Sequence, residues 1–299
     1  MKQKSLSMKR LDGITGYLMV GPAVVLLIIF VIVPLFMALQ YSFYDVSWHL
    51  ESEFVGFENF RQIINTTVFR QSLSNALRFV AIIVPSIVIV SFLVANTLAS
   101  LKRGFATVVK TSIYIPGIVS GIAIGLVFNF IFNYNAGIIN QTIRGFGMDR
   151  IAFYTVPLNA ILTISSVTLW MALGGTVILM YAARVNVPGE FYEAASIDGA
   201  NAFHKLIFIT IPQMKNIFIL VTISGVTGTL QMFDLPFIMT AGGPVNRTLT
   251  PMLYLFNQHR DQNRTLGFTV AGALLIMIFI AVINSLIFTI IRSEKSIEG

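Results

Sequence analysis

Amide, hydroxyl and aromatic side chains occur together within two otherwise apolar blocks of the sequence. The first block carries Asn129 and Asn133, which share a helix face by their spacing, and leads to Gly137 and Asn140. The second block contributes six residues, namely Gly228, Thr229, Gln231, Met232, Phe233 and Asp234. A sugar offers hydroxyls that polar side chains hydrogen-bond and a C–H face on which aromatic rings stack. The two blocks therefore predict a binding site for a polyhydroxylated ligand.

The same residues have a second interpretation. Unpaired amides are costly in hydrocarbon, so these groups must face either a cavity or a neighbouring helix. Hydrogen bonds between helices would satisfy them, and Gly225 and Gly228 would then only let helices approach closely. The residue types alone leave both interpretations open.

The sequence lacks the motifs for nucleotide binding and for metal binding. No GxxxxGK[ST] phosphate loop exists, because Gly104 lacks the following Lys-Ser/Thr and Gly242-Gly243 precedes a proline. The chain has no cysteine, and its histidines, His49, His204 and His259, are too scattered for a ligand cluster. We therefore expect no bound ATP, no metal site and no catalytic residue in this chain.

Composition identifies an integral membrane protein. Of 299 residues, 56% are hydrophobic and 11% are charged, with a mean hydropathy of +0.80, whereas about a quarter of a soluble domain is charged. A formal charge of +7 could indicate a nucleic-acid partner, but the positions of the basic residues do not support one. The basic residues flank apolar blocks and form no patch or stripe, so no nucleic acid is expected.

Six apolar blocks are each long enough to cross about 30 Å of hydrocarbon. They lie at about 17–41, 76–100, 112–132, 158–182, 214–238 and 268–291. The first exceeds the apolar core of a signal peptide, so we expect it to be retained as a span. The predicted organisation is an N-terminal segment (1–16), a first span (17–43), a polar loop with an interfacial helix (44–75), a five-span core (76–291) and a tail (292–299). The predicted fold is all-α.

The basic residues also predict the orientation of the spans. With the N-terminus inside the cell, every lysine lies on the cytoplasmic side, together with Arg10, Arg103, Arg184 and Arg292. Both termini are then cytoplasmic, the 44–75 loop is extracytoplasmic, and the polar stretch 188–212 faces the cytoplasm.

The stretch 188–212, PGEFYEAASIDGANAFHKLIFITIP, predicts two short helices. Pro188 suits a helix start, and Glu190 and Glu193 complement the positive end of the helix dipole. Gly199 is a plausible stop, because glycine adopts left-handed φ freely. A second helix is predicted from about residue 201 towards 208, with Pro212 reopening the chain.

This 188–212 segment resembles the EAA loop in membrane subunits of bacterial binding-protein-dependent ABC importers. The resemblance rests on Glu193-Ala194-Ala195, Gly199, Ile209 and Ile211-Pro212, with isoleucine replacing the usual leucine before the proline. In that family the two coupling helices sit in a cleft of the ATPase subunit. The resemblance implies ATPase-coupling roles for Glu193, Ala194, Ala195, Asp198, Gly199, Phe203 and Pro212.

A second stretch narrows the resemblance to the carbohydrate branch, the maltose and glycerol-phosphate type. Residues 54–60, FVGFENF, look like the FVG-x-(D/E)-N-(F/Y) signature that precedes the permease core. An amphipathic interfacial helix from Phe57 to Phe69 is the alternative, and both interpretations can hold. In maltose-type permeases the sugar-binding positions correspond to Asn133, Gly137, Asn140, Gly225, Gly228, Thr229, Met232 and Phe233. Thr229 and Met232 depart from the amides found there.

The resemblance implies a six-span permease in a bacterial cytoplasmic membrane that imports a sugar or oligosaccharide by alternating access. It also implies a second permease subunit, two ATP-binding cassette subunits that hold ATP and Mg²⁺, and an extracytoplasmic solute-binding protein. A permease of the same superfamily for a sugar-phosphate, phosphate or amino acid is an alternative. A self-contained secondary carrier is another, with Asp234 the nearest candidate for a proton relay, although contact with water at a helix end explains this residue more simply.

Overall fold

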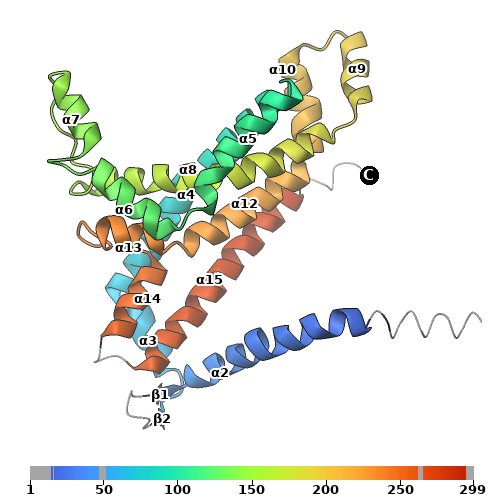
Figure 1. Ribbon diagram of the computed structural model, residues 1–299. Coiled ribbons are helices and arrows are strands. Elements are labelled where there is room, and N and C mark those ends of the chain that lie inside the picture. Colours follow the sequence, from blue (N-terminus) through green and yellow to red (C-terminus); the bar gives the residue numbers. More distant parts are fainter. Residues whose placement is uncertain (1–14, 16, 47–51, 262–264, 294–299) are drawn as a thin grey trace, which may run out of the picture. The chain divides into compact units, whose positions relative to one another are not determined.

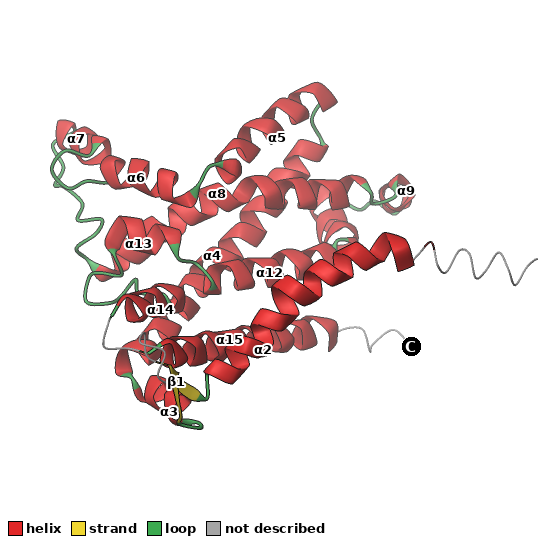
Figure 2. Ribbon diagram, turned by 60° about the horizontal axis from the view of Figure 1, so that its bottom comes forward, coloured by secondary structure: helices red, strands yellow, loops and turns green. Residues whose placement is uncertain are grey.

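The computed structural model describes residues 15, 17–46, 52–261 and 265–293, and most of them are helical (Figure 1). Figure 2 shows the small amount of strand that accompanies the helices. Most of the predicted N-terminal segment (1–16) and tail (292–299) lies outside the described residues. The chain divides into two compact units. The first comprises Met1–Ile64 with Gln258–Leu275, and the second comprises Asn65–Asn257 with Ile276–Gly299.

Four predicted apolar blocks fall on single helices that are long and apolar enough to cross a membrane, and the other two overlap bent pairs of shorter helices. Among the described residues, four single helices are long and apolar enough, namely Tyr17–Tyr41, Thr67–Ala99, Pro157–Val185 and Leu266–Ile290. Two bent pairs also qualify, Gly104–Ile118 with Gly121–Ile131 at 95° and Ala202–Gln213 with Lys215–Leu230 at 68°. If each bent pair is one span, the described chain has six.

The first unit starts with a helix that tolerates an internal proline. Within Tyr17–Tyr41, a π-helical turn, η1 (Ile28–Ile32), precedes α2 (Val33–Tyr41). Pro34 has no N–H and would clash with the carbonyl four residues earlier in a regular helix. The extra residue of the π turn accommodates it.

A hairpin and a short helix follow in the same unit. Strands β1 (Tyr44–Val46) and β2 (Ser52–Phe54) pair antiparallel, and α3 spans Glu58–Asn65. Asn59 is 4% exposed, and its amide donates to the carbonyls of Ser42 and Tyr44 at 3.0 Å each. Gly56 has φ +59°. The FVGFENF stretch therefore supplies a turn and an anchor. The helix predicted over 57–69 is shorter than expected, because Phe69 belongs to the next helix.

The second unit contains most of the helices. They are α4 (Thr67–Ala99), α5 (Arg103–Ile118), α6 (Gly121–Ile131), α7 (Ile138–Gly145), α8 (Pro157–Val185), α9 (Gly189–Ile197), α10 (Ala202–Lys205), η2 (Leu206–Thr210), α11 (Ile211–Gln213), α12 (Lys215–Leu230) and α13 (Asp234–Thr240). Two further helices continue from one unit into the other, α14 (Pro251–Arg260) and α15 (Leu266–Ser293).

The core of this unit is built on α8. Helices α4 and α5 pack along α8, and α12 packs against α4. A Cβ at Gly174 would lie 2.5 Å from the carbonyl oxygen of Ile113, so the backbones of α8 and α5 approach closely there. On the part of α15 within this unit, the Asn284 amide donates to the Thr227 hydroxyl of α12 over 2.8 Å.

Two predicted spans are not single straight helices. The 112–132 block breaks between α5 and α6, where Val119 and Ser120 adopt extended ψ angles of 143° and 133°. Pro116 and the glycines beside the break explain it, because proline and glycine are the weakest helix formers. The 214–238 block likewise ends at Leu230 and resumes in α13, which packs on α6.

Candidate functional site

The first helix of the 188–212 segment ends as its sequence predicted. Helix α9 begins at Gly189 after Pro188 and ends at Ile197. Gly199 has φ +79°, the Gly199 N–H donates to the Ser196 carbonyl, and the Ala200 N–H donates to the Ala195 carbonyl over 2.8 Å. This pair of bonds is the Schellman motif, which needs a left-handed residue at the position of Gly199.

The second helix of the segment runs further than predicted. Asn201 caps it by accepting from the His204 N–H at 2.9 Å, and helical structure continues through α10, η2 and α11 to Gln213. Pro212 does not reopen the chain, because the π turn η2 precedes it, as η1 precedes Pro34 in the first span. The 68° bend to α12 lies at Met214.

The predicted coupling residues lie on the outside of this segment. Those classed as exposed are Glu193, Ala194, Asp198, Gly199, Phe203 and Pro212, whereas Ala195 is half-buried. The apolar side chains of Ile197 and Phe203 are 88% and 68% exposed. Carboxylates beside exposed apolar groups make this surface suitable for a basic and apolar protein cleft.

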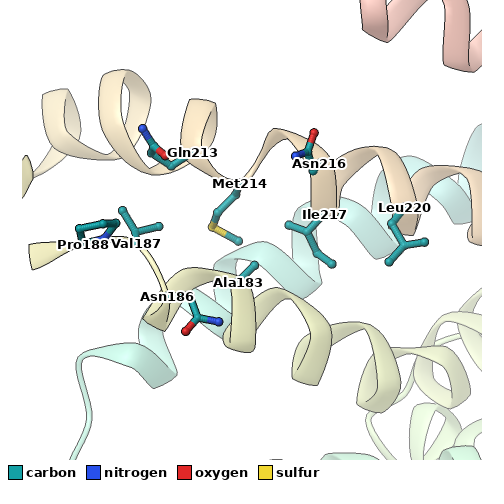
Figure 3. Close-up of a pocket in the computed structure, with 9 residues that line it drawn as sticks. All are labelled: Ala183, Asn186, Val187, Pro188, Gln213, Met214, Asn216, Ile217 and Leu220. Carbon is teal, nitrogen blue, oxygen red and sulfur yellow. The ribbon is translucent and has the colours of Figure 1, made fainter. Parts of the chain in front are cut away.

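A small cavity of about 390 Å³ lies behind the bend, between α8 and α12 (Figure 3). Met214, which is 1% exposed, points between these two helices, whereas Gln213 and Asn216 point to the other side. Met214 belongs to a buried cluster with Phe92 and Met180. The bend is therefore supported by packing against α4 and α8.

A second cavity of about 500 Å³, here called the α12 cavity, lies at the other end of α12. All six residues predicted from the second apolar block line it: Gly228, Thr229, Gln231, Met232, Phe233 and Asp234. The remaining lining comes from α4, α5, α6, α8 and the neighbouring parts of α12 and α13: Ile83, Ile87, Gly117, Gly121, Thr168, Met171, Ala172, Thr176, Ser224, Gly225 and Leu235. Asp234 is the one charged side chain of this lining.

The polar groups of the α12 cavity differ in how they are held. Met232 is 9% exposed, and its sulfur accepts from the Thr168 hydroxyl at 3.4 Å. Gln231 and Asp234 are exposed, and their side chains hydrogen-bond no other described residue. A Cβ at Gly121 would lie 2.8 Å from Oδ2 of Asp234, so this carboxylate lies against the N-terminus of α6. The helix dipole favours a negative charge there.

The residues predicted from the first apolar block do not line this cavity. The Asn129 amide donates to the Ile238 carbonyl at 3.0 Å, and Asn133 Oδ1 accepts from the backbone N–H groups of the turn that follows. Asn140 is fully buried and exchanges two hydrogen bonds with the backbone of Ile151. A Cβ at Gly137 would overlap the Asn133 carbonyl. These contacts favour the alternative of internal hydrogen bonding, and ligand contact by these residues stays a prediction.

A half-buried tyrosine, Tyr154, supports the same region. The Tyr154 hydroxyl donates to the Phe128 carbonyl at 3.1 Å, and burial raises the pKa of the Tyr154 phenol. The phenol therefore keeps its proton, which this hydrogen bond requires.

The sequence interpretation missed the walls of the α12 cavity that come from other helices. Thr168, Ala172 and Thr176 recur at intervals of four on α8, and this spacing places them on one helix face. Gly117 and Gly121 flank the break between α5 and α6. Helical spacing and the run of helix breakers from 116 to 121 were the available signals.

Solved structures establish the fold. A bacterial ABC transporter involved in the import of the acidic polysaccharide alginate superposes with a TM-score of 0.83 and 19% identity, over 99% of this chain and 100% of that one. A bacterial alginate ABC transporter in complex with a periplasmic protein bound to an alginate pentasaccharide gives a TM-score of 0.76 at 21% identity. The fold is that of a transmembrane subunit of an ABC importer.

Sequence relatives establish the family, although no family model matches the chain. The lactose transport system permease protein LacF of Rhizobium radiobacter is 30% identical over 293 residues, which cover 97% of this chain and 98% of LacF. The arabinooligosaccharides transport system permease protein AraP of Halalkalibacterium halodurans is 31% identical over 275 residues, 91% of this chain and 85% of AraP. The chain belongs to the permease subunits of carbohydrate ABC importers.

Proposed function

We propose that this chain forms one half of the pathway through which an ATP-driven importer moves a neutral sugar or oligosaccharide by alternating access. One observation carries the proposal. Helix α12 connects the α12 cavity at its C-terminal end to the 188–212 segment at its N-terminal end. Its 16 residues span about 24 Å. A movement of the segment therefore has a direct mechanical route to the cavity.

The charge of the cavity supports a neutral substrate. Its lining residues include one carboxylate, on Asp234, and no lysine, arginine or histidine. A carboxylate accepts hydrogen bonds from sugar hydroxyls and repels an anionic substrate. Relatives named for lactose, arabinooligosaccharides and trehalose/maltose agree with this choice. An acidic saccharide is the second candidate, because a relative is named for sulfoquinovosyl glycerol and the solved neighbours import alginate.

The remaining parts of the machine follow from the same proposal. A second permease subunit completes the pathway, and two ATP-binding cassette subunits hold ATP and Mg²⁺ and hydrolyse the nucleotide. One of these ATP-binding cassette subunits contacts the exposed face of the 188–212 segment. An extracytoplasmic solute-binding protein delivers the sugar. Both termini and the 188–212 segment face the cytoplasm, in agreement with the position of every lysine.

Uptake by the complete transporter in proteoliposomes tests the proposal. We expect radiolabelled neutral disaccharides such as lactose or maltose to be taken up only with Mg-ATP, the ATPase subunits and the loaded binding protein. Uptake that persists without the ATPase subunits would show a secondary carrier. Thermal-shift screening of the binding protein against neutral sugars, uronic acids and sugar-phosphates would identify the substrate. A preference for the anions would contradict the neutral assignment.

Asp234→Asn gives a matched test of the charge. The variant keeps the shape of the side chain and one acceptor oxygen, but it replaces the other oxygen with an NH2 donor and removes the negative charge. We expect it to keep uptake of neutral sugar and to weaken the exclusion of an acidic analogue. Equal exclusion by the wild-type protein and the variant would show that Asp234 does not select by charge.

A further inference from the structure

The two helices of the 188–212 segment are tied to each other and to two long helices by three side-chain contacts. The hydroxyl of Tyr192, on α9, lies 2.9 Å from the hydroxyl of Thr210, on the π turn η2. The guanidinium carbon of Arg184, near the end of α8, lies 4.7 Å from the centre of the Tyr192 ring. Nε of Arg184 also donates to Oδ1 of Asn96, near the end of α4, at 3.0 Å.

These contacts are shielded from solvent. Thr210 is 1% exposed, and Tyr192, Arg184 and Asn96 are each half-buried. Cation–π contacts and hydrogen bonds gain strength as solvent is excluded. In contrast, the bond between Lys205 and Ser196, which also joins the two short helices, is exposed.

The π turn determines how Thr210 takes part. Its hydroxyl also lies 3.3 Å from the carbonyl of Lys205, five residues earlier. A threonine hydroxyl has one proton and two acceptor lone pairs. When Thr210 donates that proton to the Lys205 carbonyl, Tyr192 is the donor to Thr210. The hydrogen bond from Tyr192 therefore ends on the one turn of the second helix whose backbone departs from α-helical geometry.

We propose that Tyr192 is a positioning residue for energy coupling. It fixes the angle between the two short helices through Thr210 and carries their movement to α8 and α4 through Arg184. Without this connection, the ATPase would move the segment while the long helices followed incompletely. The inference rests on the proposed function, and it assigns the coupling to particular contacts within this chain.

The test measures how a nucleotide signal reaches the α12 cavity in the complete transporter in liposomes. This chain has no cysteine, so Ser224→Cys, in the cavity lining, introduces the one thiol of this subunit. The partner subunits would carry no reactive thiol. The maleimide labelling rate at this position is compared between the nucleotide-free state and the state trapped with Mg-ATP and vanadate. We expect the two rates to differ when Tyr192 is intact.

Tyr192→Phe removes only the hydroxyl, and Thr210→Val replaces the partner hydroxyl with a methyl group of similar size. We expect each variant to reduce the nucleotide-dependent difference about fivefold, which corresponds to one net hydrogen bond. The double variant should show no further loss beyond that of Thr210→Val, because the bond that Tyr192→Phe removes is then already absent. Arg184→Lys keeps the charge but loses the planar donor to Asn96, and should also reduce the difference.

Matched controls separate this role from general packing. Tyr114→Phe, on α5, and Thr97→Val, on α4, remove hydroxyls that make no contact with Tyr192. Both controls should respond to nucleotide as the wild-type protein does. A full response in Tyr192→Phe and Thr210→Val overturns the proposal, as does a loss that Tyr114→Phe reproduces. If the labelling rate of Ser224→Cys with Tyr192 intact is the same with and without nucleotide, both the proposed function and this assignment are overturned.

Discussion

The polar side chains near the two ends of α12 differ in whether they are hydrogen-bonded within the chain. At the N-terminal end, side chains of the 188–212 segment bond to one another, as Tyr192 does to Thr210. Met214 fills the bend beside them. At the C-terminal end, Gln231 and Asp234 reach into the α12 cavity without a hydrogen-bond partner among the described side chains or backbone.

The proposed function gives the two ends different contacts, and this accounts for the difference. Under the proposed function the N-terminal end transmits force, which requires stiffness, and there Tyr192 is bonded to Thr210 and Met214 is packed in a buried cluster. A part that binds a hydrated ligand must leave polar groups available, because a sugar replaces water only where donors and acceptors are free. One helix joins the two parts, so its ends can be tested by substitutions with opposite expected effects.

The largest expected effect is at the packed end. Met214→Ala removes a side chain that is 1% exposed, and deletion of a buried methionine side chain costs about 2–5 kcal/mol of stability. We expect a clear fall in the thermal unfolding temperature of the purified transporter. Leu220→Ala is the matched control, because Leu220 lines the same small cavity but is 49% exposed. Equal losses in both variants would contradict a packed bend.

Asn140→Ala tests whether the polar side chains of the first apolar block serve internal hydrogen bonding or ligand binding. Asn140→Ala leaves the backbone of Ile151 without its side-chain partners, and each unsatisfied buried group costs about 1–3 kcal/mol. Unfolding should therefore shift to lower temperature. Asn133→Ala should lower the unfolding temperature less, because Asn133 is exposed. If Asn140→Ala unfolded normally but lost ATPase stimulation by sugar-loaded binding protein, ligand contact would be the better interpretation.

Gly199 tests the turn between the two short helices. A residue other than glycine pays about 1–2 kcal/mol in the left-handed region, and the φ of Gly199 is +79°. Gly199→Val should uncouple ATP hydrolysis from uptake while the protein still inserts into the membrane. Gly199→Asn should retain most uptake, because asparagine tolerates this conformation. No Cβ clash complicates the comparison, since the space around Gly199 is open. Normal uptake by Gly199→Val would falsify the role of this turn.

The smallest effect on stability is expected at the free end. Gln231→Ala removes an exposed amide with no described partner, so unfolding should be unchanged within about 0.5 kcal/mol. ATPase stimulation by sugar-loaded binding protein should fall several-fold, because a ligand hydrogen bond is lost. A lower unfolding temperature with normal stimulation would place Gln231 in the packed class.

The apolar blocks and the short helix pair could be predicted from the sequence, because both depend on local residue types. Length and hydropathy reveal a helix that can cross a membrane, and Gly199 after Asp198 reveals a stop. They did not reveal the break at Val119–Ser120 or the separation of α13 from α12. An apolar block has the same composition whether the helix inside it is straight or bent.

The candidate site could be predicted only in part, for a related reason. An amide side chain that bonds a backbone carbonyl and one that faces a ligand have the same residue type and the same apolar neighbours in the sequence. Gln231 and Asn129 therefore look alike in sequence, although the structure places one in the α12 cavity and bonds the other to Ile238. The passage of the second short helix through Pro212 was missed because a π turn leaves no composition signal.

The hairpin of the first unit has a consequence for biosynthesis. A Cβ at Gly267 would overlap the Tyr44 carbonyl and lie close to the Asn59 amide, so β1 and α3 settle against the backbone of the last helix. The ribosome completes residues 44–59 long before it reaches Gly267. The hairpin that follows the first apolar helix therefore reaches its contact with Gly267 only after the start of α15 has been synthesised. Nascent chains stopped before Gly267 should leave the hairpin open to protease, and chains extended through α15 should protect it.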